Sequence, residues 1–464
     1  MACELYNSPP YLQNLDNCNR KGTGWTMWGS IVRLLAKNTT AFENIFWHSW
    51  NLLGSAISPY LNFQKPNITS SVSDRVQIAA AAIEKIRSTS NTSEGLFSDL
   101  ANISFGISAT FYSQLAEFDL IVNQTTYEDA VQNYFPLAEA SRPGLLDEFV
   151  SSPSQMNFIM EVIYHPFHSS SVKQMNYGLA NGYAAIRAYM IYNNDTFLAY
   201  AEECWNSNQA YALTDADFSG TFALKDFPLQ SSCQGITMAG GVFWETDINN
   251  PSIDGLGTGV NQDTSLREIF LMGSISSAKV ISISLSALLA KATSNQTYLI
   301  AAQTSATFIK AHLYNINGVV QDTISAREND SCSTSGNMWP YNAGLMIEGL
   351  ATLYSFTQNA TMQSLLNDAI VAAVQNTVWV ADSGIIASGT QKLGDNMLAR
   401  GLLVAYSHNA TSAEIRTYIE AFLGVQYNAI IDLATANGTN IYTASWATLQ
   451  AQTLPLYQLP PYPP

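Results

Sequence analysis

The chain has 464 residues, of which 47% are hydrophobic and only 12% are charged. Its 20 basic and 36 acidic side chains give a net charge of −16, which argues against nucleic acid or an anionic membrane surface as a partner. No stretch approaches 18 uninterrupted apolar residues, so we expect no transmembrane segment. The hydrophobic content excludes disorder, and the composition predicts an acidic, charge-poor globular protein.

Eleven N-x-S/T sequons offer another source of solubility for a chain with so few charges. Any one of them has a plain explanation as a turn or a helix cap. As a set they predict a secreted glycoprotein, although Met1–Lys37 lacks the basic and apolar regions of a signal peptide. We expect an error at the start of the gene model, the alternative being a protein that is not exported. The sequons begin at Asn38, Asn67, Asn91, Asn102, Asn123, Asn194, Asn295, Asn329, Asn359, Asn409 and Asn437.

Five sequons stand between two helical patterns, which predicts an all-α fold built from hairpins. The second helix of each hairpin has apolar residues at i, i+3, i+4 and i+7, as Phe197, Tyr200 and Ala201 illustrate. The first helix is apolar nearly all round, so we expect an inner ring of buried helices wrapped by an outer ring. The one-sided helices follow Asn123, Asn194, Asn295, Asn359 and Asn409, and the apolar segments are Ala184–Tyr192, Leu285–Ala292, Gly344–Phe356 and Met397–Tyr406.

The remaining segments define the expected domain boundaries. Residues 1–75 form an N-terminal extension of unassigned structure, and a helix over Val76–Ile86 is expected to open a helical domain that spans residues 76–450. Residues 451–464 form a Pro-rich tail that cannot be helical. Short β-like segments predict loops or two-stranded ribbons at one end of the ring, at Gly241–Trp244, Val319–Val320 and Gly384–Ile386.

The cysteines and histidines give no sign of a metal site. The chain has no CxxC motif or Cys/His cluster, so we expect neither a metal nor another cofactor. Cys233 and Cys332 both lie in Ser-rich loops, “SSCQG” and “DSCST”. In an exported protein we expect these two to form a disulfide, with Cys204 as a buried free thiol. The alternative is three reduced thiols.

Three loops combine glycine, aromatic and polar side chains. “CQGITMAGGVFWETD” contains Trp244, “VVQDTISA” contains Asp322, and “YNAGLMIEGLA” opens an apolar helix with Tyr341 and Asn342. Taken alone, each has a purely structural explanation. These are a glycine turn beside core aromatics, a helix cap, and the start of a hydrophobic helix.

In this order the loops resemble glycoside hydrolase family 76, whose members are endo-α-1,6-mannanase-like proteins. Within this family the resemblance is to the fungal type. “YAAIRAYMIYNNDTFLAYAEECW” (Tyr183–Trp205) and “TSEGLF” (Thr92–Phe97) fit the same pattern, and the resemblance covers roughly residues 76–445. It implies an (α/α)6 toroid, a secreted monomer and cleavage of the α-1,6-mannan backbone. It also implies that the substrate groove is lined by Trp244, Asp322, Tyr341 and Asn342.

The resemblance further implies two adjacent catalytic aspartates at the start of an inner helix, here Gln174–Tyr189. One carboxyl attacks or stabilises the anomeric carbon while the other protonates the leaving oxygen. Without gaps, Asn176 and Tyr177 occupy the two positions, and with a three-residue insertion Val172 and Lys173 do. Neither register supplies a carboxylate, so retaining hydrolysis at that site should be abolished.

Other carboxylate pairs have ordinary explanations. Asp147–Glu148 is expected to begin a helix, where acids favour the dipole. Glu202–Glu203 is expected on the polar side of an outer helix, and Asp215 and Asp217 in a polar turn.

Two further departures from the family pattern affect the expected ring. Val260–Ile281 is longer than the pattern allows, and after Trp446 the chain turns Pro-rich where a last inner helix is expected. A ring without that helix would expose an apolar flank. We interpret both features as errors in predicted exon boundaries, with real divergence as the alternative.

Three hypotheses of function follow. The first is a glycosidase-like protein acting on α-1,6-mannan or a related neutral wall polysaccharide. The second is a catalytically inactive carbohydrate-binding pseudoenzyme, because the aspartate pair is absent. The third is a lyase or epimerase on the same scaffold, which would need a histidine or tyrosine base.

Overall fold

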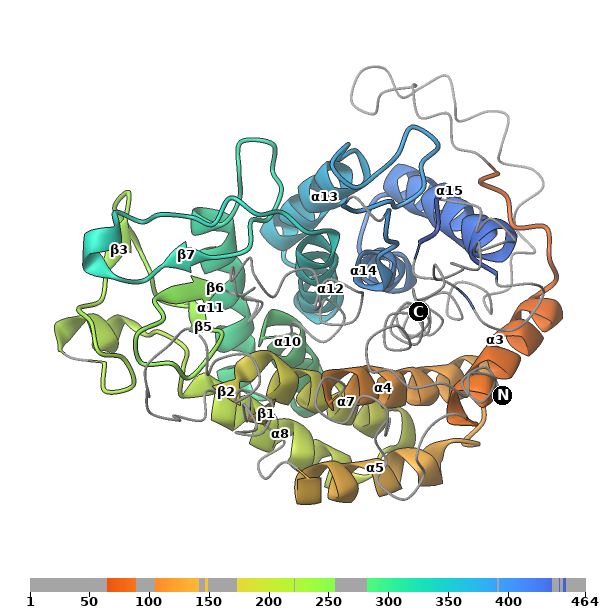
Figure 1. Ribbon diagram of the computed structural model, residues 1–464, viewed down its shortest axis with the longest axis horizontal. Helices are drawn as coiled ribbons and strands as arrows, with labels where there is room; N and C mark the ends of the chain where they lie inside the picture. The colour runs from red at the N-terminus through yellow and green to blue at the C-terminus, as the bar shows by residue number, and fades with distance from the viewer. Residues whose placement is uncertain are drawn as a thin grey trace, which may run out of the picture.

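The computed structural model describes residues 65–88, 105–141, 147–148, 173–220, 222–254, 282–389 and 392–435, together with Tyr442 and residues 445–447. Most of its regular structure is helical, as the sequence predicts (Figure 1). Helices in this part of the chain form five inner–outer pairs. The inner helices are α4 (Phe105–Val122), α7 (Met175–Tyr192), α10 (Ser282–Thr293), α12 (Pro340–Thr357) and α14 (Asn396–Ser407), and the outer ones are α5 (Glu128–Ser141), α8 (Asp195–Gln209), α11 (Gln296–His312), α13 (Ala360–Val374) and α15 (Ala413–Ala429).

The sequon asparagines mark the turns between the paired helices. Asn194, Asn295 and Asn359 are N-caps whose side-chain oxygens accept hydrogen bonds from backbone N–H groups two residues on, at 3.0, 2.9 and 2.9 Å. Each therefore satisfies a donor that the helix itself leaves unpaired. Asn123 and Asn409 instead adopt the left-handed conformation, with φ of 55° and 54°.

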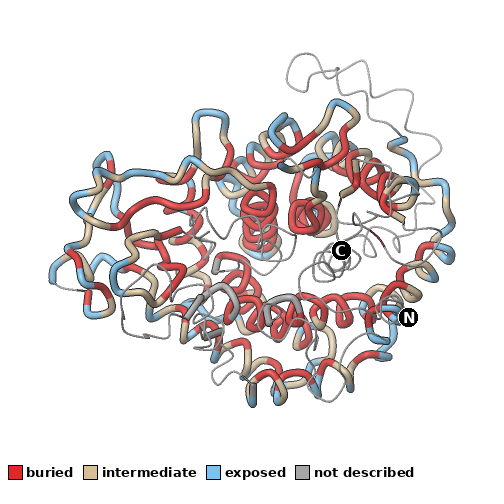
Figure 2. The backbone as a smooth tube through the Cα atoms, viewed as in Figure 1, coloured by how far each residue is buried: buried red, intermediate tan, exposed pale blue. Residues whose placement is uncertain are grey.

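Burial confirms the predicted difference between inner and outer helices. All residues of α12 from Pro340 to Leu353 are buried, whereas the buried residues of α8 recur at Phe197, Ala201, Cys204, Trp205 and Asn208. Figure 2 shows the same contrast, with inner helices buried over most of their length and outer helices exposed on one side. An inner helix has neighbours on all sides, so nearly every side chain must be apolar or paired.

Hydrogen bonds between the inner helices show that these helices run in the same direction. Ser284 at the start of α10 donates to the Leu345 carbonyl near the start of α12, at 3.3 Å. Lys291 near the end of α10 lies 3.2 Å from His408, the C-cap of α14. Tyr192, the last residue of α7, donates to Asp119 near the end of α4. The turns that carry the five sequons therefore lie at one end of the molecule, called here the turn end, and the inner helices begin at the other, called here the site end.

Glycines let two inner helices approach at backbone distance. A Cβ atom at Gly401 of α14 would lie 2.0 Å from the Gly344 carbonyl oxygen of α12. A Cβ at Gly344 would in turn lie 2.3 Å from the Met397 carbonyl oxygen. Any larger residue at either position would force the two helices apart.

Helices α3 and α4 lie at the start of the hairpin series. Helix α4 is the first inner helix, and it is the helix predicted before Asn123, to which the sequence pattern assigns no bounds. Helix α3 (Val72–Arg87) contains the predicted Val76–Ile86 helix and packs between the last and first outer helices. Ser70 contacts the Tyr427 hydroxyl of α15 at 3.0 Å, and Glu84 accepts a 3.0 Å hydrogen bond from Tyr127 beside α5. Helix α3 therefore bridges the two ends of the hairpin series, as Figure 1 also shows.

The strands are short and lie toward the site end. Gly241–Trp244, predicted as a loop or a two-stranded ribbon, is instead part of a three-stranded antiparallel sheet, because Ile324–Ser325 add a third strand. Val319–Val320 and Gly384–Ile386 contribute isolated bridges only. The sheet contains β5 (Val242–Phe243), β6 (Ser252–Asp254) and β7 (Ile324–Ser325), and the two smaller ribbons pair β1 (Asp147–Glu148) with β2 (Lys173–Gln174) and β3 (Ser232–Cys233) with β4 (Ile236–Thr237).

Several sequence predictions lie outside the described residues. They concern the N-terminal extension, which contains Cys3 and Cys18, the Val260–Ile281 insertion, the last inner helix and the Pro-rich tail. The last described residues return to the inner ring, where the Trp446 indole lies against Gly394, just before α14. No described helix is long and apolar enough to span a bilayer.

Candidate functional site

Polar side chains gather at the site end, where the inner helices begin. Tyr341 and Asn342 stand in the first turn of α12, directly after Pro340, which suits the first turn because it needs no N–H donor there. The Asn342 amide nitrogen donates to the Asp322 carboxylate at 3.2 Å. Asp322, Tyr341 and Asn342 are all buried, so the structure brings three of the four predicted groove residues together.

Negative charges surround the Tyr341 hydroxyl. Burial raises the pKa of Tyr341 well above its usual value, and the nearby carboxylates of Asp322, Asp395 and Asp254 raise it further. Asp254 ends β6 and Asp395 precedes α14, so three separate segments bring carboxylates to one phenol. Nothing in the sequence marks Asp254 or Asp395 as site residues, because only the tertiary structure brings them to Tyr341.

The side-chain oxygen of Asn342 and the indole nitrogen of Trp339 are buried and have no hydrogen-bond partner in the described part of the chain. Buried polar atoms are nearly always paired, so atoms of this kind indicate a place for water or ligand hydroxyls. The Trp339 and Tyr341 rings lie nearly parallel, with an 8° interplanar angle and centroids 6.3 Å apart. A hydrogen-bond acceptor, a hydrogen-bond donor and two aromatic rings thus occur together at the start of α12.

The pKa of the Asp395 carboxyl lies well above the usual value for aspartate. Burial raises its pKa to about 6, against hydrogen bonds from the Leu398 and Met397 backbone that lower it. Its carboxylate caps α14 by accepting the Leu398 N–H at 2.8 Å. A carboxyl with such a pKa is partly protonated in mildly acidic solution and can donate a proton there.

Trp244, the fourth predicted groove residue, is buried directly after β5. The sheet connects its strand to the cluster, since Val242 lies opposite Asp254 and Ile253 lies opposite Ile324. Glu245 follows it and accepts a hydrogen bond from Asn250. Trp244 is therefore buried at the end of a strand whose neighbour, β6, ends in Asp254.

A disulfide joins the loops outside the same sheet. Cys233 and Cys332 are bonded, with their Cα atoms 5.9 Å apart, and Cys204 is a buried free thiol. The bond connects β3 to the loop that follows β7. It therefore holds together the two loops that flank Trp244 and Asp322 in sequence.

The resemblance assigns the family's aspartate pair to Asn176 and Tyr177, or in the other register to Val172 and Lys173. Asn176 and Tyr177 lie in the first turn of α7, and Lys173 lies in β2 just before it. The expectation that Asp147–Glu148 begins a helix is wrong, because these residues form β1. The backbone of Asp147 lies opposite Gln174 and that of Glu148 opposite Lys173, so pairing with β2 fixes an extended conformation.

The remaining carboxylate pairs have structural partners. Glu202 accepts a 2.9 Å hydrogen bond from Tyr298 of the neighbouring outer helix. Asp217 accepts from the Thr214 backbone at 2.7 Å, and Asp215 from Thr237 at 2.7 Å. No group of three or more His, Cys, Asp or Glu residues within the described ranges is arranged to hold a metal ion.

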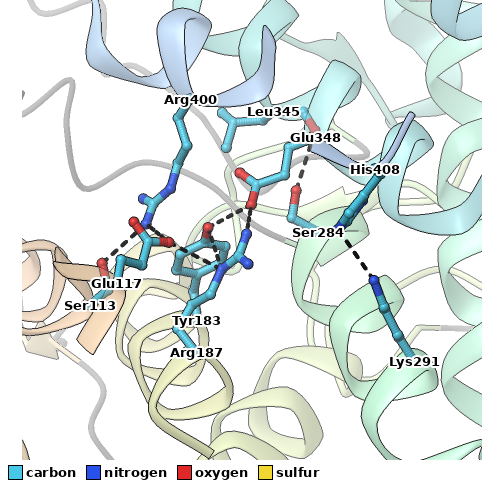
Figure 3. Close-up of polar contacts among 10 residues, drawn as sticks. All are labelled: Ser113, Glu117, Tyr183, Arg187, Ser284, Lys291, Leu345, Glu348, Arg400 and His408. Atoms are coloured by element: carbon cyan, nitrogen blue, oxygen red, sulfur yellow. Dashed lines mark hydrogen bonds and ion pairs between the residues drawn. The ribbon is translucent and has the colours of Figure 1, made fainter. Parts of the chain in front are cut away.

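A buried ionic cluster joins four inner helices beneath the site end (Figure 3). Glu117 of α4 lies 2.6 Å from Arg400 of α14 and 3.4 Å from Arg187 of α7. Arg187 also pairs with Glu348 of α12, and Glu348 accepts a 2.5 Å hydrogen bond from Tyr183 of α7. Both guanidinium groups lie over the Tyr183 ring, at 4.9 and 4.6 Å from its centroid.

The ionic cluster balances two positive against two negative charges. Burial lowers the pKa of Arg187, but Tyr183, Glu348 and Glu117 raise it by more, so its guanidinium stays charged. Glu348 follows Tyr341 by seven residues and Arg400 follows Asp395 by five, so the ionic cluster lies roughly 7–11 Å further along the helices. It therefore fixes the helices whose first turns carry the candidate site.

Comparisons with known proteins agree with this architecture. A model of glycosyl hydrolase family 76 matches residues 272–455, which is less than half of the chain. The match includes Asp322, Tyr341, Asn342 and Asp395. No curated protein matches at a significant level.

Solved structures match over more of the chain. The GH76A α-1,6-mannanase from Salegentibacter sp. HEL1_6 is 14% identical, with a TM-score of 0.57, and the match covers 81% of this chain and 93% of that one. Two inactive variants of the same enzyme, with adjacent aspartates replaced by asparagine or by alanine, match at 13% identity with TM-scores of 0.57 and 0.58. They were solved in complex with α-1,6-mannotriose and α-1,6-mannotetrose. This chain therefore has the fold of these mannanases.

Proposed function

We propose that this protein is a glycoside hydrolase of family 76, of the fungal type, that acts on α-1,6-mannan or a related neutral wall polysaccharide. The observation that carries the proposal is the buried cluster of Asp322, Tyr341 and Asn342 at the start of α12, within the segment that the family model matches. The shared fold adds support, and we propose that the hairpins complete an (α/α)6 ring. The fungal assignment rests on the order of the sequence motifs.

The chemistry of the cluster suits a neutral sugar. A mannose unit offers hydroxyl donors and acceptors and an apolar ring face, but no charge. The unpaired Asn342 oxygen can accept from a hydroxyl, the Trp339 indole can donate to one, and aromatic faces can stack on the ring.

Hydrolysis also needs a proton donor and a second carboxylate. Asp395 can supply the proton because its pKa of about 6 keeps it partly protonated at mildly acidic pH. Asp322, held by Asn342, is the second carboxylate that we place at the site. We propose that Asp395 and Asp322 carry out hydrolysis in place of the family's aspartate pair, which the start of α7 lacks.

A non-catalytic carbohydrate-binding role is the second candidate. It is favoured by Asn176 and Tyr177, since an amide and a phenol stand where the family resemblance implies catalytic aspartates. A pseudoenzyme would keep the sugar contacts of the Tyr341 cluster and release no product.

Incubation of the purified protein with α-1,6-mannan separates the two candidates. A hydrolase releases shorter oligomannosides, and Asp322→Asn and Asp395→Asn each reduce the rate by at least about 100-fold. The matched control Asp195→Asn, the same change at an exposed position of the turn end, leaves the rate unchanged. Binding measured by calorimetry without product release supports the pseudoenzyme. Product release that survives both Asp322→Ala and Asn176→Ala contradicts the site assignment, and absence of binding and hydrolysis contradicts both candidates.

We also propose that the protein is exported and monomeric. The Cys233–Cys332 disulfide and the exposed sequons support export, because disulfides persist in oxidising compartments. Secretion from a eukaryotic host with an added signal peptide, followed by light scattering, tests both statements. Retention in the cell contradicts export, and a dimeric mass contradicts the monomeric state.

A further inference from the structure

Five sequons share one end of the molecule. They begin at the turns that follow inner helices, whereas the Tyr341 cluster lies where inner helices begin. Two other described sequons lie toward the site end, since the Asn67 carbonyl contacts Asn428 at the end of α15 and Asn329 lies in the loop beyond β7. The five at the turn end are Asn123, Asn194, Asn295, Asn359 and Asn409.

Helix capping does not account for the triplets. At Asn194, Asn295 and Asn359 the cap uses the asparagine oxygen and a backbone N–H, so it needs no hydroxyl at the third position. Asn123 and Asn409 are not N-caps but left-handed residues just past the ends of α4 and α14, a position that needs no threonine two residues on. All five nevertheless have threonine two residues on. Two different backbone geometries thus share the feature that an N-glycosylation acceptor requires.

The acceptor nitrogens are accessible. Asn123, Asn295, Asn359 and Asn409 are exposed, and Asn194 is half-exposed. Their side-chain hydrogen bonds in the described structure use the oxygen atoms, and the Asn409 oxygen accepts from Arg416. A sugar attached to the nitrogen would leave these contacts intact.

Exposed apolar side chains stand beside four of the five turns. Leu120 precedes Asn123 with 52% of its surface exposed, and Ile300 follows Asn295 with 59% exposed. Met190 and Phe356, near Asn194 and Asn359, are also exposed. Apolar groups of this size cost solubility unless something covers them, and the chain has few charges to compensate.

We propose that these five asparagines carry N-linked glycans, which cover the turn end. Each asparagine nitrogen forms a bond to the anomeric carbon of a polyprenyl-pyrophosphate-linked oligosaccharide. The bond from that carbon to the pyrophosphate oxygen breaks, the amide loses one proton, and polyprenyl pyrophosphate leaves. The inference rests on topology and exposure and is independent of the proposed hydrolysis.

Mass spectrometry of the full chain, secreted from a eukaryotic host, tests the proposal. Enzymatic release of N-glycans in ¹⁸O-water converts each occupied asparagine to labelled aspartate. We expect label at no fewer than three of the five turn-end positions. Label at two or fewer overturns the proposal, whatever the protein does to mannan.

Two matched triple variants test the covering role. Asn194→Asp, Asn295→Asp and Asn359→Asp keep the caps, and Thr196→Val, Thr297→Val and Thr361→Val keep the asparagines; both sets remove three acceptors. Each triple should lose three glycans, keep wild-type helicity and mannan binding, and aggregate at least several-fold more at equal concentration. A correctly folded triple that stays as monodisperse as the glycosylated protein overturns the covering role. A triple that loses mannan binding while folded overturns the separation of the two ends.

Discussion

Asp395 combines a helix cap with a buried carboxyl at the candidate site. A capping aspartate at an exposed helix start is normally ionised, because the N-terminal end of the helix favours negative charge. Here burial outweighs that effect and raises the pKa to about 6. The folded protein therefore holds a proton between about pH 4 and pH 6 that the unfolded chain has released.

This proton makes stability fall as pH rises through that window. Between pH 4 and pH 7 the unfolding free energy of the wild type should fall by up to about 3 kcal/mol more than that of Asp395→Asn. Asparagine retains the cap and cannot titrate, so the difference between the two proteins isolates this carboxyl. Urea unfolding at pH 4, 5, 6 and 7 measures it. Parallel stability curves would contradict the raised pKa.

The contact between α12 and α14 depends on two glycines. A Cβ atom at Gly401 would lie 2.0 Å from a backbone oxygen, which no side-chain adjustment can relieve. Gly401→Ala should therefore destabilise the protein by at least about 2 kcal/mol and shift the first turns that carry Tyr341 and Asp395. Gly220→Ala is the matched control, since open space surrounds that position, and should change stability by less than about 0.5 kcal/mol. Chemical denaturation of both variants distinguishes the two cases.

The ionic cluster should behave as a coupled unit of four inner helices. Arg187→Met or Glu348→Leu alone leaves the buried cluster with one uncompensated charge and should cost about 3–5 kcal/mol. The double variant should cost clearly less than the sum, because both charges then leave the interior together. The exposed Arg87–Glu84 pair of α3 provides the control and should show a coupling energy of about 1 kcal/mol or less. Additive effects in the buried pair would contradict the proposed coupling.

At the scale of the whole molecule, the disulfide restrains two loops 99 residues apart in sequence. Replacing Cys233 and Cys332 together by serine should lower the unfolding free energy by about 2–5 kcal/mol, because the unfolded chain regains the freedom of a long loop. Cys204 should stay unreactive toward thiol reagents in the folded state, since burial raises its pKa and the thiolate is the reactive form. Calorimetry of the double variant and thiol titration of the native protein measure the two effects. Reaction of Cys204 at the rate of a free thiol would show that the interior opens.

Much of the fold was predictable because hairpins have local signals. Asn194, Asn295 and Asn359 cap the helices that follow them, and the apolar stripes after them match the buried faces of α8, α11 and α13. The sequence pattern assigns no bounds to α4, because its buried residues include Ser113 and Glu117 among apolar residues, which breaks the expected hydrophobic pattern. Those polar residues are explained only by their partners on α7 and α14.

Some residues of the candidate site are recognisable from the sequence, and others only from the packing. Tyr341, Asn342 and Asp322 were found from the motif order, because two of them are adjacent in the chain and the third lies in a neighbouring loop. Asp254 and Asp395 were missed because they look like an ordinary strand end and helix cap. Their relation to Tyr341 comes from the packing of β6 and α14 around the start of α12.

The sequence by itself determined a charge-poor, helical protein whose turns carry sequons and whose inner helices are apolar, because capping and periodicity are local properties of the chain. Only the tertiary structure decided which charges meet, since Glu117, Arg187, Glu348 and Arg400 come from four helices. It also decided that the five sequon turns lie at the end opposite Tyr341. That separation follows from the parallel direction of the inner helices, a property that no single segment of the sequence encodes.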